Sequence, residues 1–194
     1  SARLCKPEKL VSDKHRMVFW INVYNAWTLR SMLGFYPTTS ILNHTLDKNN
    51  NTYGIWKQNP IKIAGNNYHL DGIEHQILRP MGDARIHFAI VCASGGCPPL
   101  RGEAFTVSRL SEQLDDNGRV FFSNKEKFKA DLTNKSVSLS QIFKWFAKDF
   151  GADQSAVLKR LSSWVTDGEI KALMKSGKVK VKYLDYDWFI NEQK

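Results

Sequence analysis

The chain has 194 residues, of which 42% are hydrophobic and 24% are charged. This length suffices for one well-buried core, and the composition excludes a disordered or fibrous protein. The net charge is +9, but the lysines are scattered and no block of about five like charges occurs. We therefore expect a solvated basic surface and no specific nucleic-acid partner.

The apolar runs and the amino end say little about compartment. No run of about 18 apolar residues occurs, so we expect no transmembrane segment. The chain opens at Ser1 without an apolar leader and enters a helical pattern almost at once, so we expect a truncated or processed amino end. Its three cysteines, Cys5, Cys92 and Cys97, are too few for the disulfide framework of a small secreted protein.

Residues 9–33 carry apolar side chains at three- and four-residue spacing, and Gly34 follows them. This pattern predicts a mostly buried helix that stops at the glycine. Asn22 and Asn25 lie inside it and need hydrogen-bond partners if the helix is buried. Backbone groups of other segments are the partners that we expect.

An asparagine-rich loop at 47–54 precedes two short runs, 61–64 and 68–70, which predict a hairpin around the turn between them. Asp71 then stands three residues before Glu74, a spacing typical of a capping box. We expect these two residues to open a helix over 72–79 that ends at Pro80.

The second half of the chain mixes helical and strand patterns. A continuous apolar run at 85–91 predicts a central strand that is buried on both faces. The other predicted elements are a helix at 108–123, strands at 128–132, 136–139 and 178–184, a helix capped by Ser140 that reaches Phe150, and short helices opened by Asp153 and Asp167. Without a regular βαβ rhythm, these elements predict an α+β fold: one domain, 1–194, with a central mixed or antiparallel sheet and several packed helices.

Residues 85–101 hold the strongest chemical signal, because an apolar run leads directly into a glycine-rich loop with two thiols. A cysteine nucleophile needs a base, a group that orients the base, and donors for a developing oxyanion. Backbone N–H groups of residues 94–96 are candidates for the oxyanion donors. The side-chain candidates are Cys92 or Cys97 as the single nucleophile, His87 or His75 as the base, and Glu74 or Asn25 as the orienting group.

Geometry restricts how these residues combine. On a straight strand His87 and Cys92 would lie about 16 Å apart and face opposite sides, so a bulge or a returning loop is needed to join them. His75 lies on another helix and is freer to reach the loop, but neighbouring helical residues point about 100° apart, so Glu74 would not hold it. A Glu74–His87–cysteine site is therefore as admissible as one that uses His75.

Other interpretations of the same residues stay open. Cys92 can serve as a small apolar residue, Glu74 as a helix cap and His87 as an internal hydrogen-bonding group. Cys92 and Cys97 could form a redox-active disulfide if the loop brings their Cα atoms within about 7 Å. The Cys-x4-Cys spacing fits zinc sites poorly, so we expect no metal and no cofactor.

Six segments, residues 19–26, 36–37, 70–79, 85–101, 140–150 and 186–188, form a larger pattern along nearly the whole chain. Together, and in this order, they resemble the bacterial family catalogued as domain of unknown function 547. The resemblance implies a thiol-protease-like arrangement of glutamate, histidine and cysteine. These map onto Glu74, His87, and Cys92 or Cys97, and the resemblance also implies a periplasmic or exported protein more than a cytoplasmic one.

The sequence therefore predicts a cysteine-dependent hydrolase or transferase that acts on an amide or peptide-like substrate. Two alternatives remain: a non-catalytic binding module of the envelope or cell surface, and a thiol–disulfide redox protein that uses Cys92 and Cys97.

Overall fold

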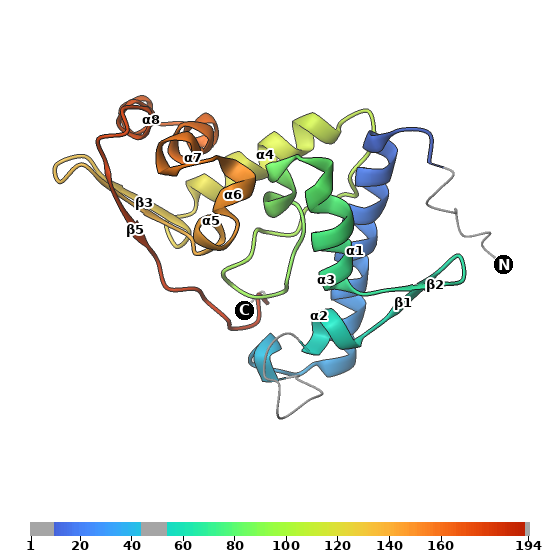
Figure 1. The fold of residues 1–194 in the computed structure, drawn as a ribbon. Helices are drawn as coiled ribbons and strands as arrows, with labels where there is room; N and C mark the ends of the chain where they lie inside the picture. Colours follow the sequence, from blue (N-terminus) through green and yellow to red (C-terminus); the bar gives the residue numbers. More distant parts are fainter. Residues whose placement is uncertain (1–9, 44–53, 193–194) are drawn as a thin grey trace.

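A computed structural model describes residues 10–43 and 54–192, without the side chains of residues 55 and 58. Cys5 and residues 47–53 of the predicted asparagine-rich loop lie outside the described residues. Figure 1 shows helices together with two small sheets, so the α+β prediction is confirmed. Within the described ranges, no helix combines the length and the apolar character that a membrane crossing requires.

Helix α1 (Asp13–Phe35) confirms the first predicted helix and runs through the core. Ser12 caps it by accepting a hydrogen bond from the His15 N–H. Its two inner asparagines bind backbone groups of other segments, as expected. Asn22 pairs with both the N–H and the C=O of Phe105, at 2.9 Å each, and Asn25 exchanges two such bonds with the segment 89–91.

The predicted hairpin is present as antiparallel strands β1 (Ile61–Ile63) and β2 (Asn66–Tyr68), after the short helix α2 (Gly54–Gln58). The next helix differs from its prediction. It starts as α3 (Leu70–Gly72), continues as a π-helical stretch η3 (Ile73–Leu78) and ends in a 3-10 turn η4 (Arg79–Met81).

The capping box predicted for this helix is wrong. His69 occupies the N-cap position, and Asp71 already lies within the first turn. The Glu74 carboxylate accepts a hydrogen bond from the Tyr24 hydroxyl, at 3.4 Å, instead of reaching back to the start of the helix. Spacing alone suggested the motif, but the helix starts two residues earlier than the motif requires.

The buried strand predicted at 85–91 is also wrong, because residues Ala84–Phe88 form a 3-10 helix, η5. Asp83 caps it by accepting a hydrogen bond from the Arg85 N–H. The backbone beyond it bonds to a side chain: Asn25 donates to Ala89 O at 2.8 Å and accepts from Val91 N at 3.0 Å. An apolar run does not distinguish a buried strand from a buried helical turn. Here the side chains of Asp83 and Asn25 bond the backbone at the two ends of the segment, in place of a neighbouring strand.

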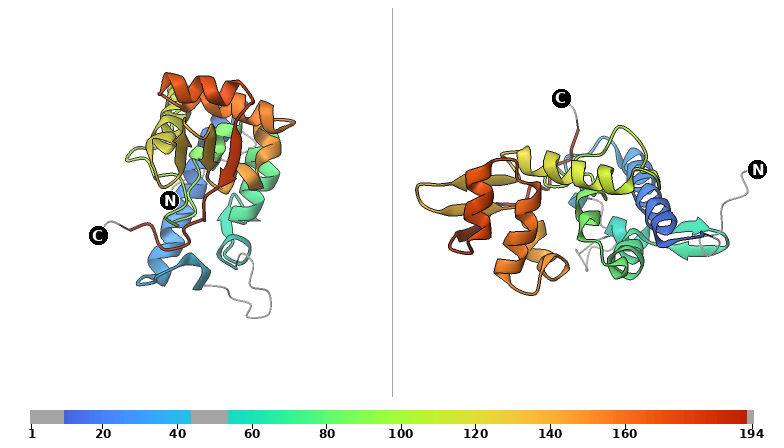
Figure 2. Two further views of the ribbon diagram at one scale, coloured as in Figure 1. Left: turned by 90° about the vertical axis from the view of Figure 1, so that its left-hand side faces the viewer. Right: turned by 90° about the horizontal axis from the view of Figure 1, so that it is seen from above.

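The rest of the chain follows the prediction closely. Strand β4 (Ser136–Leu139) pairs antiparallel with β3 (Phe128–Asp131) and parallel with β5 (Lys180–Tyr183), which gives a mixed sheet. The β1–β2 hairpin and the β3–β4 hairpin lie at opposite ends of the molecule in Figures 1 and 2. The helix predicted after Ser140 is interrupted at Phe146. The elements are α4 (Leu110–Ser123), β3 (Phe128–Asp131), β4 (Ser136–Leu139), α5 (Ile142–Trp145), α6 (Ala147–Phe150), α7 (Gln154–Leu161), η6 (Ser162–Trp164), α8 (Gly168–Lys175) and β5 (Lys180–Tyr183).

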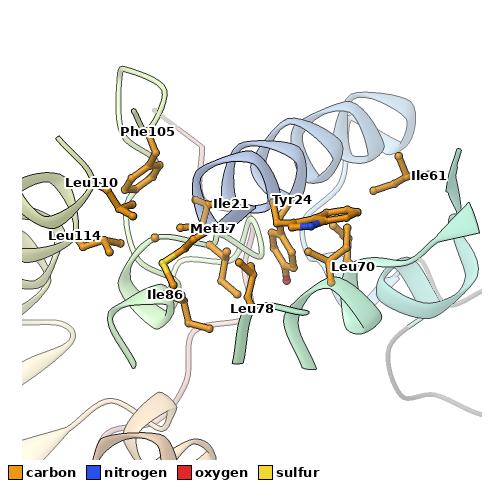
Figure 3. Close-up of a cluster of buried hydrophobic side chains, with 14 of the residues drawn as sticks. Met17, Ile21, Tyr24, Ile61, Leu70, Leu78, Ile86, Phe105, Leu110 and Leu114 are labelled. Carbon is orange, nitrogen blue, oxygen red and sulfur yellow. The ribbon is translucent and has the colours of Figure 1, made fainter. Parts of the chain in front are cut away.

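Two buried clusters hold these elements together. One lies beside α1 and includes Ile21, Leu70 and Leu78, whose side chains are drawn in Figure 3. The other is rich in phenylalanine and centres on Phe88, whose ring packs against Phe121 and Trp164. Since Ile86 belongs to the first cluster and Phe88 to the second, η5 is anchored on both sides. Such double anchoring fixes the segment that leads to the cysteine loop.

Candidate functional site

One pocket of about 680 Å³ is lined by five of the six candidate side chains that the sequence singled out, all except Asn25. They come from η3, from η5 and from the loop after η5, which the two core clusters bring to the same face. A cavity of this size accommodates a small molecule or a few residues of a peptide. The lining residues used below are Tyr24, Asp71, Glu74, His75, Arg79, His87, Cys92, Cys97, Trp145, Phe146, Tyr186 and Trp188.

Cys92 and Cys97 are joined by a disulfide in the wall of this pocket, with their Cα atoms 6.0 Å apart. The chain turns back at Ala93, whose φ of 64° lies in the left-handed region, and Cys97 N donates to Ser94 O. The two sulfurs differ in access, because Cys97 is 3% exposed whereas Cys92 is only half-buried. A reagent in the pocket would therefore meet Cys92 more readily.

Hydrogen-bond donors converge on the buried sulfur. The Cys92 N–H donates to Cys97 Sγ at 2.9 Å, and the Ser94 Oγ and the Tyr186 hydroxyl both lie 3.4 Å from that sulfur. The same two hydroxyls lie 3.0 and 3.3 Å from Cys92 Sγ. Since burial raises the pKa of Tyr186 to about 12, its hydroxyl keeps its proton and can donate. This environment favours negative charge on sulfur.

The segment after β5 brings Tyr186 to the sulfurs. It returns beside the cysteine loop (Figure 1), where Gly96 N donates to Asp187 O and Gly95 N to Phe189 O, both at 2.8 Å. A Cβ atom at Gly96 would lie 2.7 Å from the Tyr186 ring, so only glycine admits this approach. The two glycine N–H groups are thus engaged within the chain, so the oxyanion donors predicted at residues 95 and 96 are not free to bind an anion.

His87 is committed to a network on another wall of the pocket. Its Nε2 lies 2.8 Å from Asp149, and its ring stacks on Phe146 at 4.1 Å between centroids. Arg79 holds the same carboxylate through two hydrogen bonds of 2.6 and 2.8 Å. Desolvation lowers the pKa of His87 to about 4, although Asp149 opposes this shift. The imidazole is therefore neutral near pH 7, and its Nε2–H donates a hydrogen bond to the carboxylate.

Glu74 and His75 both line the pocket, but they interact with different residues: Glu74 with Tyr24, and His75 with Arg79 and Asp71. Burial raises the pKa of Glu74 to about 7, against the lowering effect of its hydrogen bond with Tyr24. His75 lies 3.1 Å from Arg79 through Nδ1 and 3.7 Å from Asp71 through Nε2, and desolvation lowers its pKa. A buried carboxyl that titrates near neutral pH suits proton transfer.

The structure gathers the predicted residues but does not link them as a triad. Among the described residues, no hydrogen bond joins Glu74 to an imidazole or either sulfur to His75 or His87. Asp149, not Glu74, is the carboxylate that holds His87. Asn25 binds backbone and orients no histidine. Within the described ranges, no three His, Cys, Asp or Glu side chains form a cluster suited to a metal ion.

Sequence reasoning missed two residues of the site: Asp149, which binds His87, and Tyr186, whose hydroxyl lies near the sulfurs. Asp149 and Tyr186 lie 62 and 94 residues from His87 and Cys92 along the chain, so no local pattern connects them. A weak signal existed, because both residues fall in segments that carry the family resemblance, 140–150 and 186–188. The exposed Trp145, 49% accessible, contacts Tyr186 and Trp188 through ring centroids 4.8 and 5.9 Å apart.

Comparison with known proteins adds the family and nothing about activity. No curated protein and no solved structure matches the chain. Residues 8–122 match a family described as protein of unknown function, DUF547, and this range includes Glu74, both histidines and both cysteines of the pocket. Asp149 and Tyr186 lie beyond it. Because the match covers more than half of the chain, the protein belongs to the DUF547 family.

Proposed function

We propose that this protein exchanges thiols and disulfides with a peptide-like substrate, through the Cys92–Cys97 pair. The observation that carries the proposal is the position of the disulfide: it forms part of the pocket wall, with one accessible sulfur and one buried sulfur surrounded by donors. Disulfides that serve only as structural links need neither feature. The proposed reaction is the oxidation of a dithiol.

Each step conserves atoms and electrons. A substrate thiolate attacks Cys92 Sγ, forms a mixed disulfide and breaks the Cys92–Cys97 bond, so Cys97 leaves as a thiolate. The second substrate thiolate attacks the substrate's own sulfur in that mixed disulfide, which releases Cys92 and closes the substrate disulfide. The substrate loses two electrons and two protons, and the protein ends as a dithiol.

The donors around Cys97 Sγ support the assignment of Cys97 as the leaving group. Leaving ability rises as the thiolate becomes more stable, and hydrogen bonds to sulfur provide that stability. The Cys92 N–H donates to this sulfur alone, at 2.9 Å. The Ser94 and Tyr186 hydroxyls lie 3.4 Å from it but 3.0 and 3.3 Å from Cys92 Sγ, and each can turn its single proton to Cys97 Sγ once that sulfur carries the negative charge.

Glu74 is the proposed proton acceptor. Attack requires the substrate thiol to lose its proton, and the pocket holds a carboxyl whose pKa burial raises to about 7. At that pH roughly half of the carboxyl groups are ionised and able to accept a proton. Trp145, Tyr186 and Trp188 give the pocket an aromatic wall suited to peptide side chains.

The test uses the oxidised protein in a Cys5→Ser background, which leaves only the pocket cysteines. The protein is mixed anaerobically with a peptide that carries two cysteines, quenched with iodoacetamide and weighed by mass spectrometry. We expect the protein to gain two alkyl groups while the peptide loses two hydrogens, and a reduction potential above about −300 mV in glutathione buffers. The Cys92→Ser/Cys97→Ser variant is the matched control and should leave the peptide reduced.

A disulfide that stays intact with these dithiols, at a potential below about −300 mV, would overturn the proposal. That result would assign the bridge a structural role and leave the pocket as the binding site of a non-catalytic module.

A cysteine hydrolase or transferase is the second candidate, favoured by the presence of Glu74 and His75 in the pocket that also holds Cys92. The activity would require a reduced Cys92 whose thiolate attacks the amide carbonyl carbon after His75 or Glu74 takes the thiol proton. The C–N bond then breaks, the amine leaves with that proton, and water or another nucleophile releases the acyl group from Cys92. The Cys92 thiol of the reduced protein should then be alkylated rapidly at mildly acidic pH, and Glu74→Ala or His75→Ala should lower this alkylation rate to that of an ordinary thiol. Slow alkylation that neither variant changes contradicts this candidate; His15→Ala, outside the pocket lining, serves as the control.

A further inference from the structure

Lys127 is a buried lysine in the turn between α4 and β3, and its side chain contacts the disulfide loop. It is only 6% exposed, and its ammonium donates to Gly95 O at 2.8 Å and to Cys97 O. The same ammonium lies 5.6 Å from the centre of the Phe121 ring. Lys127 therefore places a positive charge at the backbone of the cysteine that we assign as the leaving group.

The surroundings of Lys127 offset its charge poorly. Among the described residues, no carboxylate lies within ion-pair distance of its ammonium, so its hydrogen-bond partners are neutral carbonyl groups of the loop. Burial lowers the pKa of Lys127 to about 8, and Asp187 opposes this effect only at longer range. Burying a charge without an ionic partner is costly, and such arrangements concentrate at functional sites.

The charge has a use in the exchange reaction. When the disulfide breaks, Cys97 becomes a thiolate in a buried position, where it needs compensating positive charge. Hydroxyl and N–H donors lie near the Cys97 sulfur, and the Lys127 ammonium, which does not line the pocket, contacts the Cys97 carbonyl. Neutral donors and a positive charge thus lie near the same residue.

Resting on the proposed exchange function, we propose that Lys127 is a positioning residue that fixes residues 95–97 and stabilises the Cys97 thiolate, which makes the disulfide more oxidising. A lysine that merely ties the loop would act through its hydrogen bonds, whereas this role requires its charge. Gln keeps an N–H donor and removes the charge, and Arg keeps the charge with another shape, so the two substitutions separate the roles.

The equilibrium between the protein and glutathione tests this inference. In the Cys5→Ser background, Lys127→Gln should favour the disulfide about tenfold, which corresponds to about 30 mV. Lys127→Arg should retain most of the original equilibrium. Lys129→Gln, a change at an exposed lysine of β3, is the matched control and should have no effect. An equilibrium for Lys127→Gln equal to that of the parent, in a protein that exchanges thiols, would overturn the inference and leave the exchange function standing.

A second measurement does not depend on exchange with any substrate. In a Cys5→Ser/Cys92→Ser protein, thiolate absorbance reports the pKa of the single remaining thiol, Cys97. Lys127→Gln should raise that pKa by about one unit, since the nearby positive charge is lost. An unchanged thiol pKa in folded Lys127→Gln protein contradicts the role of the charge, whether or not the parent protein oxidises dithiols.

Discussion

The two polar walls of the pocket differ in what their contacts leave available. On the sulfur wall, the Cys92 N–H donates to Cys97 Sγ, the Ser94 and Tyr186 hydroxyls lie within reach of both sulfurs, and Cys92 is only half-buried. On the imidazole wall, Asp149 is held by Arg79 and binds His87, whose ring is covered by Phe146. The first arrangement favours cleavage of the Cys92–Cys97 disulfide, whereas the second provides a hydrogen-bond partner for the buried His87.

This difference shows that residues lining one cavity need not act together. His87 has the residue type and the position of a catalytic base, but its only hydrogen-bonded ring nitrogen faces a carboxylate, and its pKa is lowered to about 4. Its environment stabilises the neutral ring, which suits a structural network. We therefore expect changes on the imidazole wall to affect folding and changes on the sulfur wall to affect exchange.

Asp149→Ala should have the largest effect on stability, because it leaves both Arg79 and the buried His87 without their carboxylate. We expect the free energy of unfolding to fall by about 3 kcal/mol, measured by urea denaturation. The glutathione equilibrium of the folded variant should stay within about twofold of the parent value, because Asp149 binds Arg79 and His87 and not the sulfurs. A twofold change in this equilibrium corresponds to about 0.4 kcal/mol. Asp185→Ala, at an exposed site, is the control. A folded Asp149→Ala protein that has lost exchange would contradict the division between the walls.

Glu74→Gln should change the dependence of stability on pH. Because burial raises the pKa of Glu74 from 4.5 to about 7, the folded state binds more protons than the unfolded state between these values. The free energy of unfolding therefore falls as pH rises through this window. We expect Gln to stabilise the protein by about 2 kcal/mol more at pH 8 than at pH 5, relative to the parent, in urea titrations at both pH values. An equal effect at the two pH values would show that Glu74 does not titrate in this window.

Tyr186→Phe removes a hydroxyl near both sulfurs and keeps the ring. The loss should cost about 1 kcal/mol of thiolate stabilisation, so the glutathione equilibrium should favour the disulfide about fivefold. Tyr183→Phe, in β5 and outside the pocket lining, is the matched control. If Tyr186→Phe leaves the equilibrium unchanged, the hydroxyl does not serve the leaving sulfur.

Trp145→Ala should have the smallest effect, because its ring is half exposed and forms only the outer part of the aromatic wall. With glutathione disulfide added as the oxidant that restores the Cys92–Cys97 bond, we expect KM for a cysteine peptide with a neighbouring aromatic residue to rise about threefold, with little change in kcat. The same peptide with alanine beside its cysteines should show no such difference between the two proteins. A fall in kcat at constant KM would instead place Trp145 in the reaction itself.

Much of the fold could be predicted because its signals are local. Asp153 and Asp167 cap the helices that follow them, as expected, and short periodic segments form the expected strands. The segment 85–91 could not be predicted, because its conformation depends on Asn25, more than 60 residues away. Its apolar pattern is compatible with either outcome.

The candidate site was predicted in part for the same reason. Cys92 and Cys97 lie close together in the sequence, and their pairing was one of the alternatives left open. The partner of His87 was not predictable, since the interruption of a helix at Phe146 places Asp149 beside it. Residue types indicated the pocket, whereas tertiary contacts decided which groups can react.

The most direct test compares two single-cysteine proteins, Cys97→Ser and Cys92→Ser, both in the Cys5→Ser background. Each is mixed in the folded state with a peptide disulfide, and the rate at which the mixed disulfide forms is followed by mass spectrometry; both should react equally when unfolded in urea. The account predicts that Cys92, left in the first protein, reacts at least about tenfold faster than the buried Cys97 in the second. Equal rates, or faster reaction at Cys97, would contradict the assignment of Cys92 as the exchanging sulfur.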